Sequence, residues 1–282
     1  GVMEHIEEAG IHSGDSSCVL PPYSLPAETV AEIERQTVAL AKELRVVGLM
    51  NIQFAVKDGV VFILEVNPRA SRTAPFVSKA TGVPLPRLAT QVMLGKTLKE
   101  LDPWSMRRSG YVSVKESVFP FRRFPGVDIL LGPEMRSTGE VMGIAPTFEE
   151  AFLKGQWGAG QKLPEGGKVF LSVNDRDKRF VAEVARQYVD LGFELLATSG
   201  TAGLLAGQGI PSTRVLKVYE GRPNIVDLIK NGEVSLVINT ASGKRTAHDS
   251  KAIRQATLHY GVPYSTTLSG AKAIARAIAY ET

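Results

Sequence analysis

Residues 49–69 read LMNIQFAVKDGVVFILEVNPR, two apolar runs on either side of an Asp-Gly pair. Such a pair between apolar runs is typical of a tight β-hairpin turn, so the stretch predicts two antiparallel strands. Polar side chains interrupt the runs at Gln53, Glu65 and Asn67. Because residues two apart on a strand share a face, we expect Glu65 and Asn67 to point the same way.

The register of the hairpin decides whether Gln53 joins them. A two-residue loop at 58–59 would place Gln53 opposite Leu64, on the wrong face. A three-residue loop at 58–60 places Gln53 opposite Glu65, and we expect this register because it also gathers the apolar side chains on one face. That apolar face would consist of Ile52, Phe54, Val56, Phe62, Leu64 and Val66.

Three oxygen-bearing side chains on an otherwise apolar hairpin indicate a metal site. Carboxylate and amide oxygens suit Mg²⁺, which takes a few protein oxygens together with water and phosphate. Arg69 and Arg72 follow closely, and both can bind phosphate or carboxylate oxygens. The alternative is an exposed face with ordinary polar residues, but the run from Glu65 to Arg69 is an awkward ending for a buried strand.

Composition places the chain among soluble globular proteins of about two domains, with 282 residues, 44% of them hydrophobic and 22% charged. The net charge of +4 suits small anionic ligands, and no basic cluster indicates nucleic-acid binding. Cys18 is the only cysteine, which favours a reducing compartment, and we expect a cytoplasmic protein. No apolar run is long enough for a membrane span. Residues 1–8 read as the middle of a strand region, so we expect a fragment of a longer chain.

The first half of the chain mixes strands and helices. An amphipathic helix is expected at 26–44, a second helix at 85–94, and a strand at 111–119. Glycine and proline are frequent between 121 and 142, which predicts a loop-rich region, and a short helix is expected at 147–153. The Gly-rich stretch 155–167 is the clearest linker. The expected domains are residues 1–100, a connecting extension at 101–162, and 163–282.

From Lys168 strands and helices alternate, which predicts a parallel sheet with right-handed crossovers. Ligands bind such sheets at the carboxyl ends of the strands. Thr198-Ser199-Gly200-Thr201 follows a strand and opens a helix, so its N–H groups and hydroxyls could cradle a phosphate. An N-capping Thr looks the same, but Lys178, Lys217 and Asn239-Thr240 lie near other strand ends and strengthen the interpretation.

The expected strands lie at 169–173, 193–197, 214–218, 234–238 and 263–265, and the expected helices at 178–191, 225–230, 250–260 and 270–280.

These motifs resemble a known family. The run from Gln53 to Thr73 resembles the metal-binding hairpin of ATP-grasp ligases, and residues 75–84 and 132–143 are similar to the large subunit of carbamoyl-phosphate synthase. The resemblance extends over essentially the whole chain. It implies an α/β fold with an α+β part: the C-terminal part of an ATP-grasp domain, followed by a Rossmann-like, methylglyoxal synthase-like allosteric domain.

The resemblance implies a glutamine-hydrolysing, ATP-dependent ligase that phosphorylates carbamate to carbamoyl phosphate for arginine and pyrimidine biosynthesis. Arg69 and Arg72 would orient carbamate. The metals, Mg²⁺ or Mn²⁺, would be held by Gln53, Glu65 and Asn67. The implied partner is a small glutamine amidotransferase subunit in a hetero-oligomer. The residues implied to contact ATP are Gly10, Ile11, His12, Ser13, Gln53 and Glu65.

The resemblance also implies regulatory and ion sites. The implied UMP or IMP ligands are Lys178, Thr198, Thr201, Lys217 and Asn239, with Thr240, Lys244 and Arg245 less secure because Ala241 replaces a hydroxyl common in relatives. Ornithine would be held by Glu7, Asp15, Glu116 and Thr266, and a monovalent cation, K⁺, by His5, Glu7 and Ser16. The lyase of this fold needs an Asp in the loop at 220–224, and its absence excludes lyase activity here.

Other interpretations stay open. The upstream part of the ATP grasp is absent from this sequence, so we expect the chain alone to be inactive, and it could serve as an isolated regulatory nucleotide-binding fragment. A different ATP-grasp carboxylate ligase, such as a biotin carboxylase relative, is a further possibility, against which the domain from Lys168 argues. A cyclohydrolase relative of the C-terminal fold is excluded by the hairpin.

Overall fold

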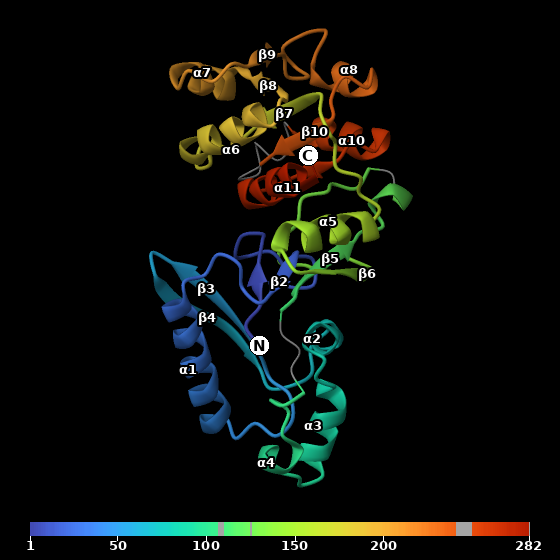
Figure 1. Ribbon diagram of the computed structural model, residues 1–282. Coiled ribbons are helices and arrows are strands. Elements are labelled where there is room, and N and C mark those ends of the chain that lie inside the picture. Colours follow the sequence, from blue (N-terminus) through green and yellow to red (C-terminus); the bar gives the residue numbers. More distant parts are fainter. Residues whose placement is uncertain (107–109, 125, 241–249, 282) are drawn as a thin grey trace. The chain divides into compact units, whose positions relative to one another are not determined.

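The computed structural model describes residues 1–106, 110–124, 126–240 and 250–281, which fold into two compact units (Figure 1). Each unit is assembled from separate segments of the chain. The first comprises Gly1–His5, Ser16–Glu116 and Val141–Gly155, and the second comprises Ile6–Asp15, Ser117–Glu140 and Gln156–Thr282. The contiguous limits expected from the sequence, 1–100, 101–162 and 163–282, stay a prediction. Within the described residues, none of the helices is both long and apolar enough to span a membrane.

A four-stranded sheet has the order β1-β2-β5-β6, in which β2 pairs antiparallel with β1 and with β5. Its strands are β1 (Glu4–His5), β2 (Cys18–Leu20), β5 (Val112–Val118) and β6 (Gly139–Ala145). Helix α5 (Phe148–Gly158) packs closely on β6, because a Cβ at Gly143 would lie 1.9 Å from the Ala151 carbonyl oxygen. Only glycine permits this approach.

Two predicted boundaries in this region differ from the structure. The region 121–142, predicted to be loop-rich, begins with a 3-10 helix, η1 (Phe121–Arg123), and from Gly139 it belongs to β6. The expected linker begins too early, since α5 continues to Gly158. Gly155 lies in this helix and next to β5, since a Cβ there would lie 3.4 Å from the Glu116 Cβ.

The hairpin predicted to hold a metal, called the metal hairpin below, consists of β3 (Asn51–Lys57) and β4 (Val60–Asn67), and helix α1 (Ala27–Glu43) lies alongside it (Figure 1). Gln53 pairs with Glu65, as expected, but the loop length predicted to produce this register was wrong. The loop has only two residues, Asp58 and Gly59, both with positive φ, and the extra residue is a β-bulge at Leu64. Positive φ at both central positions suits the Asp-Gly pair of a type I′ turn.

The bulge also changes the apolar face of the hairpin. Phe54 pairs with Ile63 and Val56 with Val61, whereas Phe62 pairs with Ala55 on the other face. The prediction that Phe62 belongs to the apolar face was therefore wrong, whereas Leu64 is the bulged residue and its predicted face stays a prediction. Both side chains are about half exposed, at 49% and 50%. Three helices follow the hairpin in the chain: α2 (Ala74–Thr81), α3 (Leu85–Met93) and α4 (Leu98–Leu101).

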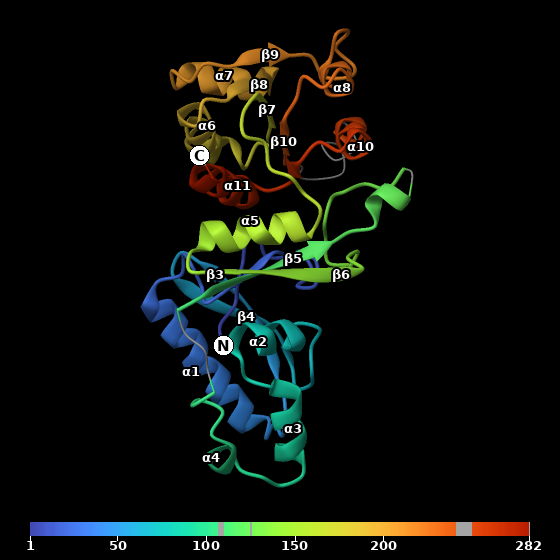
Figure 2. The ribbon, with the colours of Figure 1, turned by 45° about the vertical axis from the view of Figure 1, so that its right-hand side comes forward.

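The parallel sheet expected in the C-terminal region is present, with the order β11-β10-β7-β8-β9. Its strands are β7 (Lys168–Ser172), β8 (Glu194–Thr198), β9 (Thr213–Val215), β10 (Leu236–Asn239) and β11 (Tyr264–Ser265). Helices α6, α7 and α11 cover one face and α8 and α10 the other (Figure 2). They are α6 (Lys178–Asp190), α7 (Ser199–Gly207), α8 (Ile225–Lys230), α10 (Lys251–Tyr260) and α11 (Leu268–Glu281).

The central strands β7, β8 and β10 are apolar and buried between their ends, as expected for a sheet covered on both faces. Phe170, Leu196 and Val237 contribute to one cluster with Ile225 and Ile229 of α8 and other buried side chains. Polar residues occur instead where the strands end. From β7 the sheet is extended toward one edge by β8 and β9, and from β10 it is extended toward the opposite edge by β11. The strand order therefore reverses between β7 and β10, which are neighbours, and this place is a topological switch point.

Candidate functional site

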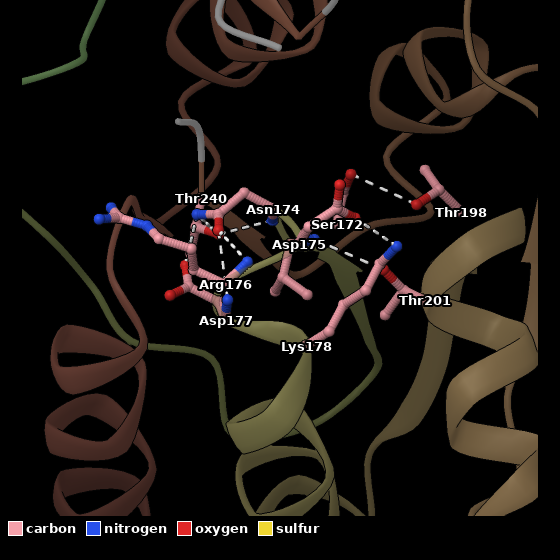
Figure 3. Close-up of polar contacts among 10 residues, drawn as sticks. Ser172, Asn174, Asp175, Arg176, Asp177, Lys178, Thr198, Thr201 and Thr240 are labelled. Atoms are coloured by element: carbon pink, nitrogen blue, oxygen red, sulfur yellow. Dashed lines mark hydrogen bonds and ion pairs between the residues drawn. The ribbon is translucent and has the colours of Figure 1, made fainter. Parts of the chain in front are cut away.

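The switch point carries a buried polar network. Asn174, just after β7, donates from its backbone N to Thr240 Oγ1 at 3.0 Å, and its Nδ2 donates to the same oxygen at 3.1 Å. Its Oδ1 accepts from the backbone N–H groups of Arg176 and Asp177, and Nδ2 also donates to the Asp177 carboxylate at 2.6 Å. Asn174 thus shapes the turn that leads into α6 and joins the ends of β7 and β10 (Figure 3).

The N-terminus of α7 lies at the end of the neighbouring strand. Thr198 ends β8, and its side chain makes no cap hydrogen bond to the helix; its hydroxyl donates instead to Ser172 Oγ at 3.4 Å. The Thr201 hydroxyl, in the first turn, accepts from the backbone N of Val173 at 3.5 Å. Both threonines are buried, at 4% and 1% exposure. A helix N-terminus without a side-chain cap offers its N–H groups and its positive end to an anion.

Lys178, the first residue of α6, brings a positive charge to this same helix terminus. A Cβ on Gly200 would lie 3.4 Å from Lys178 Nζ, so the ammonium rests against the first turn of α7. Lys178 forms an ion pair with Asp175 at 2.6 Å, and the two side chains face each other in Figure 3. The Lys178 hydrogen bond and charge lower the pKa of the Asp175 carboxyl, and the nearby charge of Lys217 adds to this lowering.

Lys217 therefore lies within electrostatic range of the same cluster. It follows β9, which ends at Val215, and its backbone N donates to the Glu220 carboxylate at 3.0 Å. Two lysines, two buried hydroxyls and an uncapped helix terminus converge at the carboxyl ends of three adjacent strands. We call these residues the cradle: Lys178, Thr198, Thr201, Lys217, Asn239 and Thr240. Its chemistry suits a phosphate group. Lys244 and Arg245 lie outside the described residues.

Sequence reasoning missed one member of this region. Arg254 of α10 is 1% exposed, and its Nη1 donates to Asn239 Oδ1 at 3.1 Å. Its Nε and Nη2 donate to the two oxygens of Asp128, each at 2.6 Å. Its position in the helix could have indicated burial, because Arg254 is next to Ile253 and one turn before Thr257, and all three are buried. A buried guanidinium requires such partners.

The metal hairpin brings its three predicted ligands to one end. Asn51 pairs with Asn67 and Gln53 with Glu65, so Gln53, Glu65 and Asn67 share a face. Asn67 Nδ2 donates to Glu65 Oε1 at 3.0 Å, and Arg69 Nη2 approaches Asn67 Oδ1 at 3.4 Å. Arg72 is exposed and follows in the next turn. Elsewhere, the described residues contain no group of three His, Cys, Asp or Glu side chains arranged for a metal.

The loop predicted to contact ATP belongs to the second unit, whereas the hairpin belongs to the first. Gly10 has φ of 105°, and the Ile11 backbone N donates to the Glu8 carbonyl at 3.4 Å. His12 donates from its backbone N to the Gly132 carbonyl at 2.8 Å, and its Nδ1 accepts from the Gly14 backbone N at 3.0 Å. In the neutral ring the proton then sits on Nε2. Ser13 is half-buried in the same loop.

The four residues predicted to bind ornithine divide between the units, with Glu116 in the first and Glu7, Asp15 and Thr266 in the second. The buried Asp15 carboxylate accepts the backbone N–H groups of Arg136 and Ser137 at 2.7 and 2.9 Å, a structural task that the sequence did not suggest. Glu116 is 8% exposed and accepts from another side chain, Ser17, at 2.5 Å. Thr266 follows β11 and is half-buried.

Of the three residues predicted to hold a monovalent cation, His5 and Ser16 lie in the first unit and Glu7 in the second. Burial, together with the charge of Lys115, lowers the pKa of His5 to about 4, so this imidazole is neutral at pH 7. A neutral imidazole can act as a ligand. Ser16 is fully buried, and its carbonyl accepts a weak hydrogen bond from the Cys18 thiol at 3.3 Å.

Two family models match the chain, one over each half. The model described as carbamoyl-phosphate synthase L chain, ATP binding domain, matches residues 1–101, and the MGS-like domain matches residues 180–266. The chain is 56% identical over 287 residues to the carbamoyl phosphate synthase large chain of Mesorhizobium japonicum, with 99% of this chain and 24% of that relative covered. The chain is homologous to the C-terminal region of carbamoyl phosphate synthase large chains.

A second relative has the same description. The carbamoyl phosphate synthase large chain of Pasteurella multocida is 58% identical over 281 residues, with 99% of this chain and 26% of the relative covered. The chain thus spans about a quarter of the length of these carbamoyl phosphate synthase large chains. Among solved structures, the biotin carboxylase domain of a thermophilic 2-oxoglutarate carboxylase bound to bicarbonate gives a TM-score of 0.38 at 15% identity, over 51% of this chain and 42% of that chain, which is too low to carry an argument.

The comparisons confirm three expectations: the resemblance to the carbamoyl phosphate synthase large chain, an ATP-binding region at the start, and an MGS-like region at the end. The mixed α/β class is confirmed as well, with an antiparallel sheet in the first region and a parallel five-stranded sheet in the second. The role of each individual site residue stays a prediction.

Proposed function

We propose that the chain is the nucleotide-responsive part of a carbamoyl phosphate synthase large chain, and that the cradle binds a nucleoside monophosphate, UMP or IMP. The observation that carries this proposal is the contact between Lys178 and the first turn of α7. An ammonium beside the positive end of a helix is unfavourable by itself. A phosphate between them would satisfy both, and the buried hydroxyls of Thr198 and Thr201 would accept or donate hydrogen bonds at its edge.

The intact large chain would use the ATP-binding region to phosphorylate carbamate, giving carbamoyl phosphate for arginine and pyrimidine biosynthesis. The hairpin fits a divalent cation, because Gln53, Glu65 and Asn67 offer oxygen atoms on one face and Asn67 already contacts Glu65. Mg²⁺ or Mn²⁺ held there would offset the charge of the nucleotide phosphates. Arg69, anchored to Asn67 and the Ala70 carbonyl, and the exposed Arg72 would orient the carbamate.

The chain alone would not carry out this reaction. The chain spans about a quarter of its relatives, so the rest of the large chain would complete the ATP site. The loop from Gly10 to Ser13 would contact ATP in the intact subunit, with His12 offering its Nε2 proton. K⁺ at His5, Glu7 and Ser16, and ornithine at Glu7, Asp15, Glu116 and Thr266, are further sites of that larger assembly.

A small glutamine amidotransferase subunit is the proposed partner, in a cytoplasmic hetero-oligomer. These proposals rest on the homology, since the chain spans about a quarter of its relatives.

Calorimetric titration of UMP, IMP and Mg-ATP into the chain tests the proposed function. We expect UMP or IMP to bind at one site and Mg-ATP to show no binding. Thr201→Ala, which removes the hydroxyl of a residue that is 1% exposed, should weaken nucleotide binding at least about tenfold because the hydroxyl would contact the phosphate. Ser269→Ala, a hydroxyl on α11 outside the cradle, serves as the control. Binding of ATP without either monophosphate would overturn the proposal.

A further inference from the structure

Asn239 ends β10 inside the cradle, and a guanidinium fixes the orientation of its side-chain amide. Arg254 Nη1 donates to Asn239 Oδ1 at 3.1 Å, and Asn239 Nδ2 donates to the Ser172 carbonyl at 3.3 Å. Arginine has five donors and no acceptor, so only the oxygen end of the amide can face it. Asn239 must therefore turn its NH₂ group toward Ser172 at the end of β7.

Asp128 in turn fixes the guanidinium. Its two oxygens accept from Arg254 Nε and Nη2, each at 2.6 Å, in a fork that allows only one orientation of the planar group. Burial alone would raise the pKa of Asp128, but the hydrogen bonds and charge of Arg254 outweigh it, and the pKa lies below its ordinary value. The pair is thus fully charged near pH 7. Arg254 itself is 1% exposed, so bulk water cannot replace Asp128 and Asn239 as its hydrogen-bond acceptors.

Asp128 also belongs to a loop that is tied to the segment 12–15. Arg136 Nη1 donates to the Asp128 carbonyl at 2.9 Å, while the Arg136 backbone N donates to the Asp15 carboxylate at 2.7 Å. The His12 backbone N donates to the Gly132 carbonyl at 2.8 Å. All of these residues lie in the second unit.

We propose that Asn239, Arg254 and Asp128 form a relay in which Arg254 is a positioning residue for the cradle and through which nucleotide binding stabilises the segment 12–15. This inference rests on the proposed nucleotide site. It adds the residues through which a bound nucleotide would affect the segment 12–15. A nucleotide that takes a hydrogen bond from Asn239 Nδ2 favours the one amide orientation that Arg254 imposes. It thereby favours the fork to Asp128 and the loop contacts beyond it. Because coupling between sites is reciprocal, ordering of 12–15 would also tighten the nucleotide.

The test uses the whole chain, UMP as the probe, calorimetry for affinity, and amide hydrogen exchange for the loops. Arg254→Lys should raise the UMP dissociation constant about tenfold, because one ammonium cannot reproduce the planar fork and the bond to Asn239 together. The matched control is Arg35→Lys, since Arg35 makes an equally bidentate pair with Glu32, but on the surface of α1. That control should leave both readouts unchanged.

Two further variants distinguish positioning from simple support. Asn239→Asp keeps an acceptor for Arg254 but offers the cradle an acceptor in place of a donor. It should raise the UMP dissociation constant at least about tenfold, and loss of the Nδ2 hydrogen bond to the buried Ser172 carbonyl should lower the melting temperature. Asp128→Asn takes the charged partner from the buried Arg254, so it should raise the UMP dissociation constant at least about tenfold and also abolish the protection that UMP gives the amides of 12–15.

The relay would be overturned if Arg254→Lys binds UMP as the unaltered chain does, or if bound UMP leaves exchange at 12–15 unchanged. If the unaltered chain binds no UMP, the proposed function fails. The contacts of the relay are then tested by hydrogen exchange of the chain without any nucleotide. Arg254→Lys should then speed exchange of the Ser137 amide, which donates to Asp15, while Arg35→Lys should not. Equal exchange in both variants would contradict the relay.

Discussion

Asp175→Asn is expected to tighten UMP binding about threefold, the opposite of what a change in a binding site ordinarily does. Lys178 Nζ lies 2.6 Å from Asp175 Oδ1, so the ammonium that the cradle would offer a phosphate is already paired with a carboxylate. The incoming phosphate has the same sign as Asp175 and must displace it. Removing the charge of Asp175 frees Lys178 and also removes a repulsion.

The size of the gain follows from exposure. The Asp175 side chain is 93% exposed and the Lys178 side chain 34%, so water screens most of their attraction. Exposed ion pairs of this kind change equilibrium constants by no more than about fivefold. Lys178→Met, which removes a charged donor, should instead weaken UMP at least about tenfold. The two variants at one ion pair are therefore expected to move the affinity in opposite directions.

Calorimetry of UMP at about 0.1 M and about 1 M salt is the assay, because screening at the higher concentration should remove most of the gain. Glu183→Gln is the matched control. It breaks a surface pair of nearly the same length, Lys272–Glu183 at 2.7 Å, between α11 and α6. Weaker UMP binding by Asp175→Asn, or an equal gain in Glu183→Gln, would refute the reasoning.

Three further outcomes are expected. Glu65→Gln in the intact large chain should abolish carbamoyl phosphate formation from ATP and carbamate, and unchanged output would contradict the metal assignment. Tyr188→Phe should lower the free energy of unfolding by about 1 kcal/mol, because the Tyr188 hydroxyl is buried and donates to the Ala271 carbonyl at 2.7 Å, with UMP affinity unchanged. His5 has its pKa lowered from 6.5 to about 4, so the unfolded chain binds the extra proton first. Stability should fall as the pH drops from about 6.5 to about 4, by up to about 1.4 kcal/mol per pH unit, and urea unfolding of His5→Gln should lack this slope.

The parallel sheet was the part of the fold that the sequence predicted best. Its central strands β7, β8 and β10 contain apolar runs, and helices α6 and α10 end at recognisable signals, Gly192 and Gly261. The residues expected at the strand ends lie together because such strands share one edge. Lys217 illustrates the limit: it lies two residues beyond β9, within the predicted strand, so its place in the cradle depends on a loop.

The errors arose where close packing or a bulge decided the structure. A β-bulge at Leu64 adds a residue without any sequence signal, so the correct pairing of Gln53 with Glu65 was reached through a wrong loop. Gly155 was interpreted as part of a linker, although it lies in a helix packed against a neighbouring strand. Arg254 was passed over because a helix pattern gives no information about a partner as distant in sequence as Asp128.

A crystal structure of the chain with UMP would test the central claim most directly. The account predicts the phosphate between Lys178 and the first turn of α7, with the Thr198 or Thr201 hydroxyl within hydrogen-bond distance and Asp175 turned away from the ammonium. UMP bound elsewhere on the chain, or a phosphate that leaves the Lys178–Asp175 pair intact, would contradict it.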